Sequence, residues 1–182
     1  MSEIRSHYTG VAIGLHWIIA VLVIAQIGLV MAGDAAQGPD ARLFRDTHKA
    51  VGISLLVLTV LRIVWRFMNP PPPMPEAMKR WEKTLASATH WLFYAVLLIL
   101  PLSGWLASSA AGRDISWFGL FNWPLLPIGG GREAAGQFMD VHRIVVKGLY
   151  VLAILHIGAA LKHQFVDRDG VLGRMLPFLA RR

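Results

Sequence analysis

The chain has 182 residues, 55% of them hydrophobic, and no cysteine, with a mean hydropathy of +0.50. Ordinary soluble domains are only about 45–50% apolar even when glycine is counted, so the composition indicates a membrane protein. The lack of cysteine excludes disulfides and every metal centre that thiolates hold. The net charge is +7, and the basic residues that produce it lie between apolar segments rather than in one stripe. This distribution argues against nucleic acid as a partner.

Two apolar segments precede the centre of the chain. Residues 11–31 contain no acidic or basic side chain and are long enough to cross a bilayer as a helix. This run exceeds the h-region of a signal peptide, about 7–15 residues, so we expect it to be retained. A second span is predicted over residues 48–67, with Arg62 and Arg66 in its last turns, where both can extend to the membrane interface.

Two further spans follow. The third is predicted over residues 85–106, where Pro101 and Gly104 are expected to kink its far end. The fourth is predicted over residues 138–162, although Asp140, Arg143 and Lys147 all lie in its first turns. Charges and histidines together in one span call for a functional explanation rather than a packing one.

The connectors differ in character. Residues 69–75 are rich in proline, which predicts a stiff non-helical turn. The longest connector, residues 107–137, carries several aromatic side chains suited to the headgroup zone, and its Gly129–131 run is predicted to be a hinge. We expect a single integral membrane domain over residues 1–182, an all-α four-helix transmembrane bundle.

Charge predicts the orientation of the bundle. The N-terminus, the second connector, the Arg62/Arg66 helix end and the C-terminal tail hold 11 of the 18 lysines and arginines, and the remaining loops hold 7. The C-terminal residues contribute most: Lys162, Arg168, Arg174, Arg181 and Arg182. Positive charge favours the cytoplasmic side, so both termini are predicted to be cytoplasmic, in a bacterial inner membrane.

Histidine spacing predicts the cofactors. His142 and His156 are 14 residues apart, close to four helical turns, so they share one helix face about 21 Å apart. If the helices alternate in direction, His16 lies at the depth of His156, and His48 lies at the depth of His142. Two layers of paired neutral nitrogen ligands suit two stacked haem b groups, bound by His16/His156 on the cytoplasmic side and by His48/His142 on the periplasmic side. Zinc fits less well, because each layer offers too few ligands for a closed tetrahedral site.

Two more histidines fall in or near the cytoplasmic layer. His90 shares the depth of His16 and His156, and three histidines cannot all be axial ligands of one iron. We assign His90 to a quinone pocket or proton handling, with an interhelical hydrogen bond or an axial role as the alternatives. His163, beyond His156, is a second candidate for the quinone pocket because both imidazoles titrate near neutral pH. Lys49 and Arg143 each follow a periplasmic histidine and are candidates for haem propionate contacts or, equally, for anchoring helix ends in headgroups.

Several stretches together resemble the bacterial cytochrome b561 family, and the match extends over essentially the whole chain. They are Leu15-His16-Trp17, His48 through Ser54 with Arg62 and Arg66, His90 through Pro101 and Gly104, His142 with His156, Leu161-Lys162-His163, and Leu172 through Pro177. The resemblance implies two b-type haems that exchange electrons with quinone in a four-helix bundle. The same histidine layout occurs in the di-haem membrane subunits of formate dehydrogenases and hydrogenases.

The small stand-alone family members resemble superoxide oxidase, which implies that electrons pass from periplasmic superoxide through the haems to ubiquinone. No side chain is expected to act as a covalent catalyst, since the cofactors carry the chemistry. Membrane lipid, quinone and superoxide are the expected partners. The alternative is a haem-b membrane anchor subunit that relays electrons between a partner dehydrogenase and the quinone pool, with the 107–137 connector as its docking surface. A transporter is disfavoured because the polar residues at membrane depth are almost all histidine.

A rim of basic residues on the periplasmic side would attract superoxide, although six acidic residues reduce its net charge to +1. Steering therefore requires local clustering. The basic residues of this rim are Arg42, Arg45, Lys49, Arg113, Arg132, Arg143 and Lys147.

The orientation can be tested with reporter fusions. A C-terminal reporter that is active only in the periplasm should stay silent, because the C-terminal tail is rich in basic residues. The same reporter inserted in the 107–137 connector should be active. The opposite pattern would reverse the orientation and exchange the two histidine layers.

Overall fold

A computed structural model describes residues 7–76 and 78–176, and four long helices dominate this part of the chain. The helices are α1 (Gly10–Ala35), α2 (Gly38–Met68), α3 (Arg80–Ala110) and α4 (Gly131–Lys162). All four are long and apolar enough to cross a membrane, which confirms the predicted four-helix transmembrane bundle. Pro177, Arg181 and Arg182, which contributed to the sequence predictions, lie outside the described residues.

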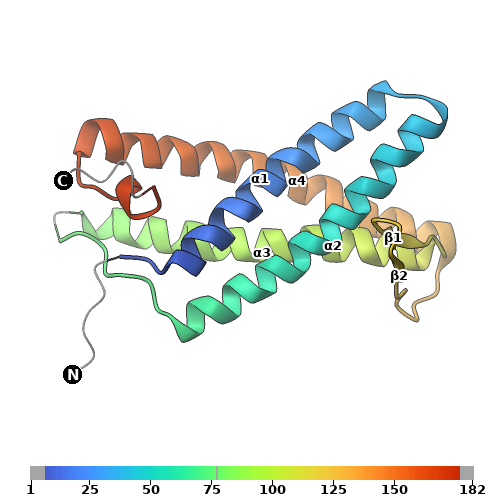
Figure 1. The fold of residues 1–182 in the computed structure, drawn as a ribbon, viewed down its shortest axis with the longest axis horizontal. Helices are drawn as coiled ribbons and strands as arrows, with labels where there is room; N and C mark the ends of the chain where they lie inside the picture. Colours follow the sequence, from blue (N-terminus) through green and yellow to red (C-terminus); the bar gives the residue numbers. More distant parts are fainter. Residues whose placement is uncertain (1–6, 77, 177–182) are drawn as a thin grey trace.

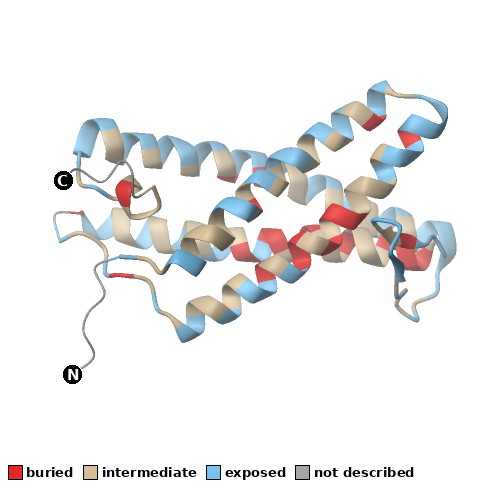
Figure 2. Ribbon diagram, viewed as in Figure 1, coloured by how far each residue is buried: buried red, intermediate tan, exposed pale blue. Residues whose placement is uncertain are grey.

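The helices form two antiparallel pairs that cross each other, α1 with α2 and α3 with α4, and α2 also packs on α3 (Figure 1). The start of α1 and the end of α4 lie at one end of the bundle, here called the termini end. A short β-hairpin marks the other, here called the hairpin end. Figure 2 shows the buried residues concentrated where the pairs cross. Ile19, Val51, Leu55 and Leu97 form one apolar cluster there, and Val96, Leu100, Leu149 and Leu152 form another.

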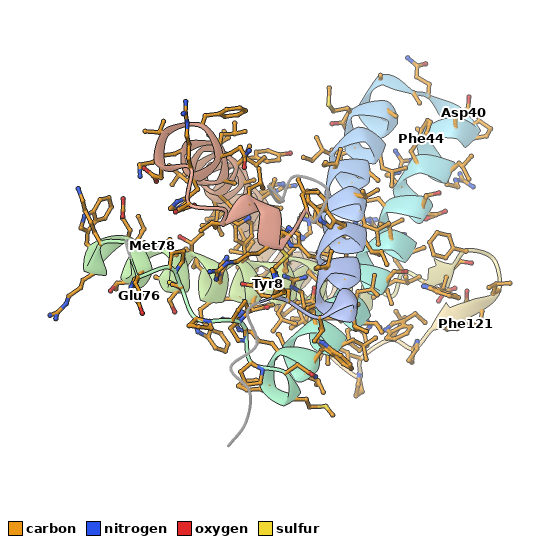
Figure 3. All side chains as sticks on the ribbon, turned by 60° about the vertical axis from the view of Figure 1, so that its left-hand side comes forward. Tyr8, Asp40, Phe44, Glu76, Met78 and Phe121 are labelled. Carbon is orange, nitrogen blue, oxygen red and sulfur yellow. The ribbon has the colours of Figure 1, made fainter. Side chains whose placement is uncertain are left out.

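Two helices begin well before the positions that hydropathy predicted. Helix α2 begins at Gly38 rather than His48, and α4 begins at Gly131 rather than Phe138. Pro39 in the first turn of α2 suits a helix start, and the charged turns that follow are helical without being apolar. In Figure 3, Asp40 and Phe44 lie on these turns, at the opposite end of α1 from Tyr8. His48 and His142 therefore lie inside their helices, and the prediction that they stand at helix ends is wrong.

The third helix also starts early, at Arg80 rather than Leu85. Glu82 accepts a hydrogen bond from the backbone N–H of Lys79, closing a capping box at the helix start. His90 is therefore almost three turns into α3, deeper than a start at Leu85 would place it. The helix continues through Pro101 to Ala110, four residues beyond the predicted end.

The long connector contains an antiparallel hairpin that the sequence analysis did not predict. Strands β1 (Ile115–Trp117) and β2 (Phe121–Trp123) pair directly, and Leu120 N–H donates to the Trp117 carbonyl across the turn. Ile115 is almost fully buried, and Trp117 Nε1 donates to Ser54 Oγ at 3.1 Å. The hairpin is thereby fastened to α2 at the hairpin end.

The chain after α4 folds back along the termini end. A single π-helical turn, His163–Asp167, follows α4 directly, and a short 3₁₀ turn covers Leu172–Arg174. Trp17 Nε1 donates to the Met175 carbonyl at 2.9 Å, and Arg174 donates to the Pro73 carbonyl at 2.6 Å. These bonds attach the segment after α4 to α1 and to the α2–α3 connector.

The start of α4 depends on glycine at position 130. Gly130 has φ of 106°, and a Cβ there would lie 2.5 Å from the Cβ of Ala134. Gly130→Ala should destabilise the protein by about 1–3 kcal/mol, because an L-residue is strained in this conformation. Thermal unfolding in detergent measures the effect. Gly129→Ala is the matched control, since its Cβ would meet nothing within 4 Å, and equal melting temperatures for both variants would contradict the argument.

Candidate functional site

Two histidines face each other toward the hairpin end. The rings of His48 on α2 and His142 on α4 have centres 6.3 Å apart and planes inclined at 71°. His142 Nδ1 lies 2.9 Å from the Leu100 carbonyl and 3.0 Å from Ser103 Oγ. A carbonyl only accepts, so Nδ1 carries the proton and Nε2 keeps its lone pair. His142 is thereby held in the tautomer that a metal-binding imidazole needs.

His48 lacks an equivalent partner. Its Nδ1 is buried and has no hydrogen-bond partner among the described residues, and neither does Oε1 of nearby Gln26. The Gln26 amide nitrogen donates to the His48 backbone carbonyl at 3.0 Å, which ties α1 to α2 at this depth. A buried imidazole nitrogen without a partner is costly, and it is typical of a group that serves a ligand.

A second group of histidines lies toward the termini end. His16 on α1 and His156 on α4 have ring centres 6.3 Å apart and planes inclined at 73°. His90 on α3 approaches the same His156 ring, with centres 5.8 Å apart. Trp17 packs edge-on against His16 and Phe93 against His156, each at 5.2 Å. Three helices therefore bring imidazoles together in this layer.

The spacing of each pair fits one metal ion between two imidazoles. Nitrogens bound on opposite sides at about 2.0–2.1 Å are about 4 Å apart, and each ring centre lies about 1 Å further out, a total of roughly 6 Å. Both His48/His142 and His16/His156 measure 6.3 Å. The donor set also fits, since a neutral imidazole is a usual axial ligand of haem iron. The residues present are suited to hold two such groups, one in each layer.

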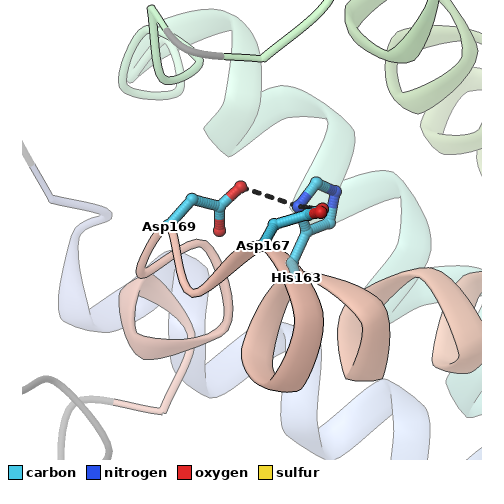
Figure 4. A group of neighbouring side chains, drawn as sticks. All are labelled: His163, Asp167 and Asp169. Carbon is cyan, nitrogen blue, oxygen red and sulfur yellow. Dashed lines mark hydrogen bonds and ion pairs between the residues drawn. The ribbon is translucent and has the colours of Figure 1, made fainter.

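His163 lies beyond His156, at the start of the π-helical turn, where two carboxylates hold its ring (Figure 4). Its Nδ1 is 2.7 Å from Asp169 Oδ2 and 3.1 Å from Asp167 Oδ2. Asp167 also binds Lys162 Nζ at 2.6 Å, and Lys162 binds Glu82 at 3.1 Å. The nitrogen and carboxylate oxygens of this cluster lie within 4.8 Å of one another, close enough for a metal ion. Lys162 pairs with Glu82 and Asp167, and His163 Nδ1 binds Asp167 and Asp169, so these contacts account for the cluster without a metal ion.

The two predicted propionate contacts are engaged with acidic neighbours. Lys49 Nζ lies 3.1 Å from Asp46 and 3.5 Å from the Asp114 carbonyl. Arg143 binds Asp140 at 2.7 Å, and both side chains are about two-thirds exposed. Ion pairs with exposed partners contribute little to stability. The pairing with Asp140 and Asp46 therefore does not fix the side-chain positions of Arg143 and Lys49.

The sequence analysis missed the position of two arginines. It placed Arg62 and Arg66 at a helix end from which they can extend to the interface, and it did not predict that both lie beside the histidine layer of the termini end. Arg62 donates to the Ala12 carbonyl at 3.2 Å, and Arg66 lies 5.7 Å above the Trp91 ring. Arg62 interacts electrostatically with His16, His90 and His156. Arg62 and Arg66 are four residues apart on α2, which puts both guanidinium groups on the same helix face. This spacing was the sign in the sequence that the two arginines act together.

These features define a multi-pass membrane bundle that carries two layers of facing imidazoles. The chain belongs to the prokaryotic cytochrome b561 family, which matches residues 7–178. The resemblance in the sequence is thereby confirmed. The protein is a bacterial membrane electron-transfer protein, and its family implies haem b as cofactor.

Curated relatives agree with this assignment. The chain is 33% identical over 173 residues to "Cytochrome b561 homolog 2" of Escherichia coli, covering 93% of this chain and 90% of the relative. It is 31% identical over 175 residues to "Cytochrome b562" of Cereibacter sphaeroides, covering 93% and 94%. It is 28% identical over 172 residues to "Probable superoxide oxidase CybB" of Yersinia pestis, covering 93% and 96%.

Proposed function

We propose that this protein binds two haem b groups, one between His48 and His142 and one between His16 and His156. The observation that carries the proposal is the shared 6.3 Å separation of the two imidazole pairs. His90 lies closer to His156, at 5.8 Å, so the match to the other pair favours His16 as the ligand. The bound haems supply one-electron transfer along the bundle, while the protein positions them.

The reaction we propose is the oxidation of superoxide coupled to the reduction of ubiquinone. Two superoxide ions each lose one electron and become dioxygen, and one quinone gains the two electrons with two protons. The family supports electron transfer in the membrane, and the relative named as a probable superoxide oxidase supports this particular donor. The proposed orientation puts superoxide at the hairpin end, facing the periplasm, and quinone at the termini end.

Basic residues at the hairpin end would attract the superoxide anion. Asp46 and Asp140 neutralise Lys49 and Arg143. The other basic residues of the rim form no ion pair within the described chain: Arg42, Arg45, Arg113, Arg132 and Lys147. These unpaired charges are the better candidates for steering, because a paired charge has little field at a distance.

We place the quinone headgroup beside the termini-end layer, within reach of His90 and His163. His163 Nδ1 is bonded to Asp169, so Nε2 is the nitrogen that could serve a quinone oxygen, and it can donate to that oxygen only when it too carries a proton. Hydrogen bonds to a carbonyl oxygen strengthen as negative charge develops on it, so both imidazoles would favour reduction. His163 directly follows α4, at the end that we propose faces the cytoplasm, and it would relay the protons that the quinone takes up.

A second candidate function is a haem-b anchor subunit for a partner dehydrogenase. The observation in its favour is the hairpin, where Phe118, Leu120 and Phe121 are 51%, 73% and 49% exposed. Exposed apolar side chains at a membrane surface suit either lipid or a docked protein. Purification separates the candidates: a protein isolated alone that consumes superoxide with ubiquinone is an enzyme, whereas an obligate complex inert to superoxide is an anchor.

The ligand assignment can be tested by counting haems. His142→Ala should lower the haem content from two to about one per chain, because only the hairpin-end layer loses a ligand. His7→Ala is the matched control, since His7 is exposed and belongs to neither layer. Pyridine haemochrome spectra give the stoichiometry. Two haems retained in both His142→Ala and His156→Ala would refute the assignment.

The partner of His156 needs its own comparison. His16→Ala should lose the termini-end haem, and His90→Ala should keep it. The reverse result would make His90 the axial ligand and His16 the neighbouring polar residue.

The quinone pocket predicts a selective kinetic defect. His90→Ala and His163→Ala should slow quinone reduction by about a hundredfold, the lower end of the usual range for loss of a proton-transfer group. Reduction of the haems by superoxide should stay at the rate of His7→Ala. Stopped-flow absorbance follows the two steps separately. Wild-type quinone kinetics in both variants would move the search for the pocket to the hairpin end.

A further inference from the structure

Two arginines line one small pocket at the termini end and a third acts on the same tyrosine, a group that we call the arginine corner: Arg62, Arg66 and Arg174. Arg62 and Arg66 line the pocket together with Tyr8 and Tyr94. Arg174 comes from the segment after α4, and its charge also acts on Tyr8. Tyr8 lies at the start of α1 in Figure 3. The corner therefore joins three separate parts of the chain around one tyrosine hydroxyl.

The arginine corner has no acidic partner in the described chain. Arg62 donates to the Ala12 carbonyl, Arg174 donates to the Pro73 carbonyl, and Arg66 lies over the rings of Trp91 and Tyr94. None of the ion pairs among the described residues includes any of the three. Three like charges close to an apolar bundle repel one another, and a bound anion would relieve that repulsion. The corner is short of negative charge.

Tyr8 adds a neutral donor to this cluster. Burial raises the pKa of Tyr8, although the neighbouring arginine charges oppose the shift. The hydroxyl therefore keeps its proton at neutral pH and can donate a hydrogen bond. Guanidinium groups present paired N–H donors that match the two oxygens of a carboxylate or a phosphate. The donors of the corner suit an oxyanion.

We propose that the arginine corner binds an oxyanion next to the termini-end histidine layer. Two sources share this chemistry: the carboxylates of the haem at that layer, a source that rests on the proposed function, and the phosphate of an anionic lipid. Position links the corner to the layer, because the charge of Arg62 acts on His16 and His156 and that of Arg66 acts on His90. Position equally places it at the membrane surface, beside the proline-rich connector.

The haem source is tested by exchanging the ligand chemistry. Holoprotein is loaded with haem b or with its dimethyl ester, which cannot carry the carboxylate charges, and haem loss to excess apomyoglobin is timed. In the wild type the ester should leave one site about tenfold faster than haem b, the value of one charge-assisted bond. In Arg62→Gln and Arg66→Gln, that difference should disappear. Arg80→Gln, an exposed arginine at the same end, should behave as wild type.

The lipid source is tested with phosphatidylglycerol added to delipidated holoprotein and counted by native mass spectrometry. A phosphate site predicts one bound lipid fewer in Arg62→Gln and Arg66→Gln than in Arg80→Gln. It also predicts that haem b and its dimethyl ester are lost at the same rate. Arg66→Lys keeps the positive charge and removes the paired N–H donors of the guanidinium group. It replaces Arg66→Gln if that variant fails to assemble. Both variants matching Arg80→Gln in haem loss and in lipid count would overturn the proposal. If the protein bound haem normally but failed to oxidise superoxide, the proposed reaction would be wrong. Haem loss and lipid count could still be measured, so the oxyanion site would be tested independently.

Discussion

Imidazoles that face each other inside an apolar bundle are the constraint on which the rest of this structure depends. A polar ring removed from water is stabilised only if its nitrogens find partners. Helix α4 supplies one histidine to each layer, and His142 and His156 lie on the same face because their separation is close to four turns. The other helices complete the layers: α2 provides His48, α1 provides His16 and α3 provides His90.

The histidine pattern was readable from sequence because helical periodicity converts spacing into position. Four apolar runs and one 14-residue interval were enough to predict which rings meet, and the structure brings His48 to His142 and His16 to His156. The helix starts were not readable in the same way. Hydropathy detects the part of a helix inside the membrane, whereas α2 and α4 continue as charged helices beyond it. The hairpin was missed because its strands are three residues each, too short for a periodic signal.

The arginines show a different limit of sequence reasoning. Arg62 and Arg66 sit near the end of an apolar run, where a long side chain can extend outward to headgroups. Their direction depends on neighbours that only the fold supplies: the Ala12 carbonyl for one, and the rings of Trp91 and Tyr94 for the other. Inward-facing charge also changes the electrostatics of the histidine layer beside it. A positive charge close to a redox centre stabilises the reduced state, so a haem bound as we propose would be easier to reduce beside these arginines.

The continuity of α4 limits where the length of this chain can change. One residue inserted between His142 and His156 would rotate everything after it by about 100°, carrying one histidine away from its partner. Insertions in the segment between the hairpin and Gly130 meet no such restriction. This segment is a loop outside the helices, so a change in its length does not rotate one histidine relative to another on the same helix. Related sequences should therefore vary in length in that loop and keep a constant interval within α4. With haems bound as proposed, this interval would set the distance that an electron crosses between them.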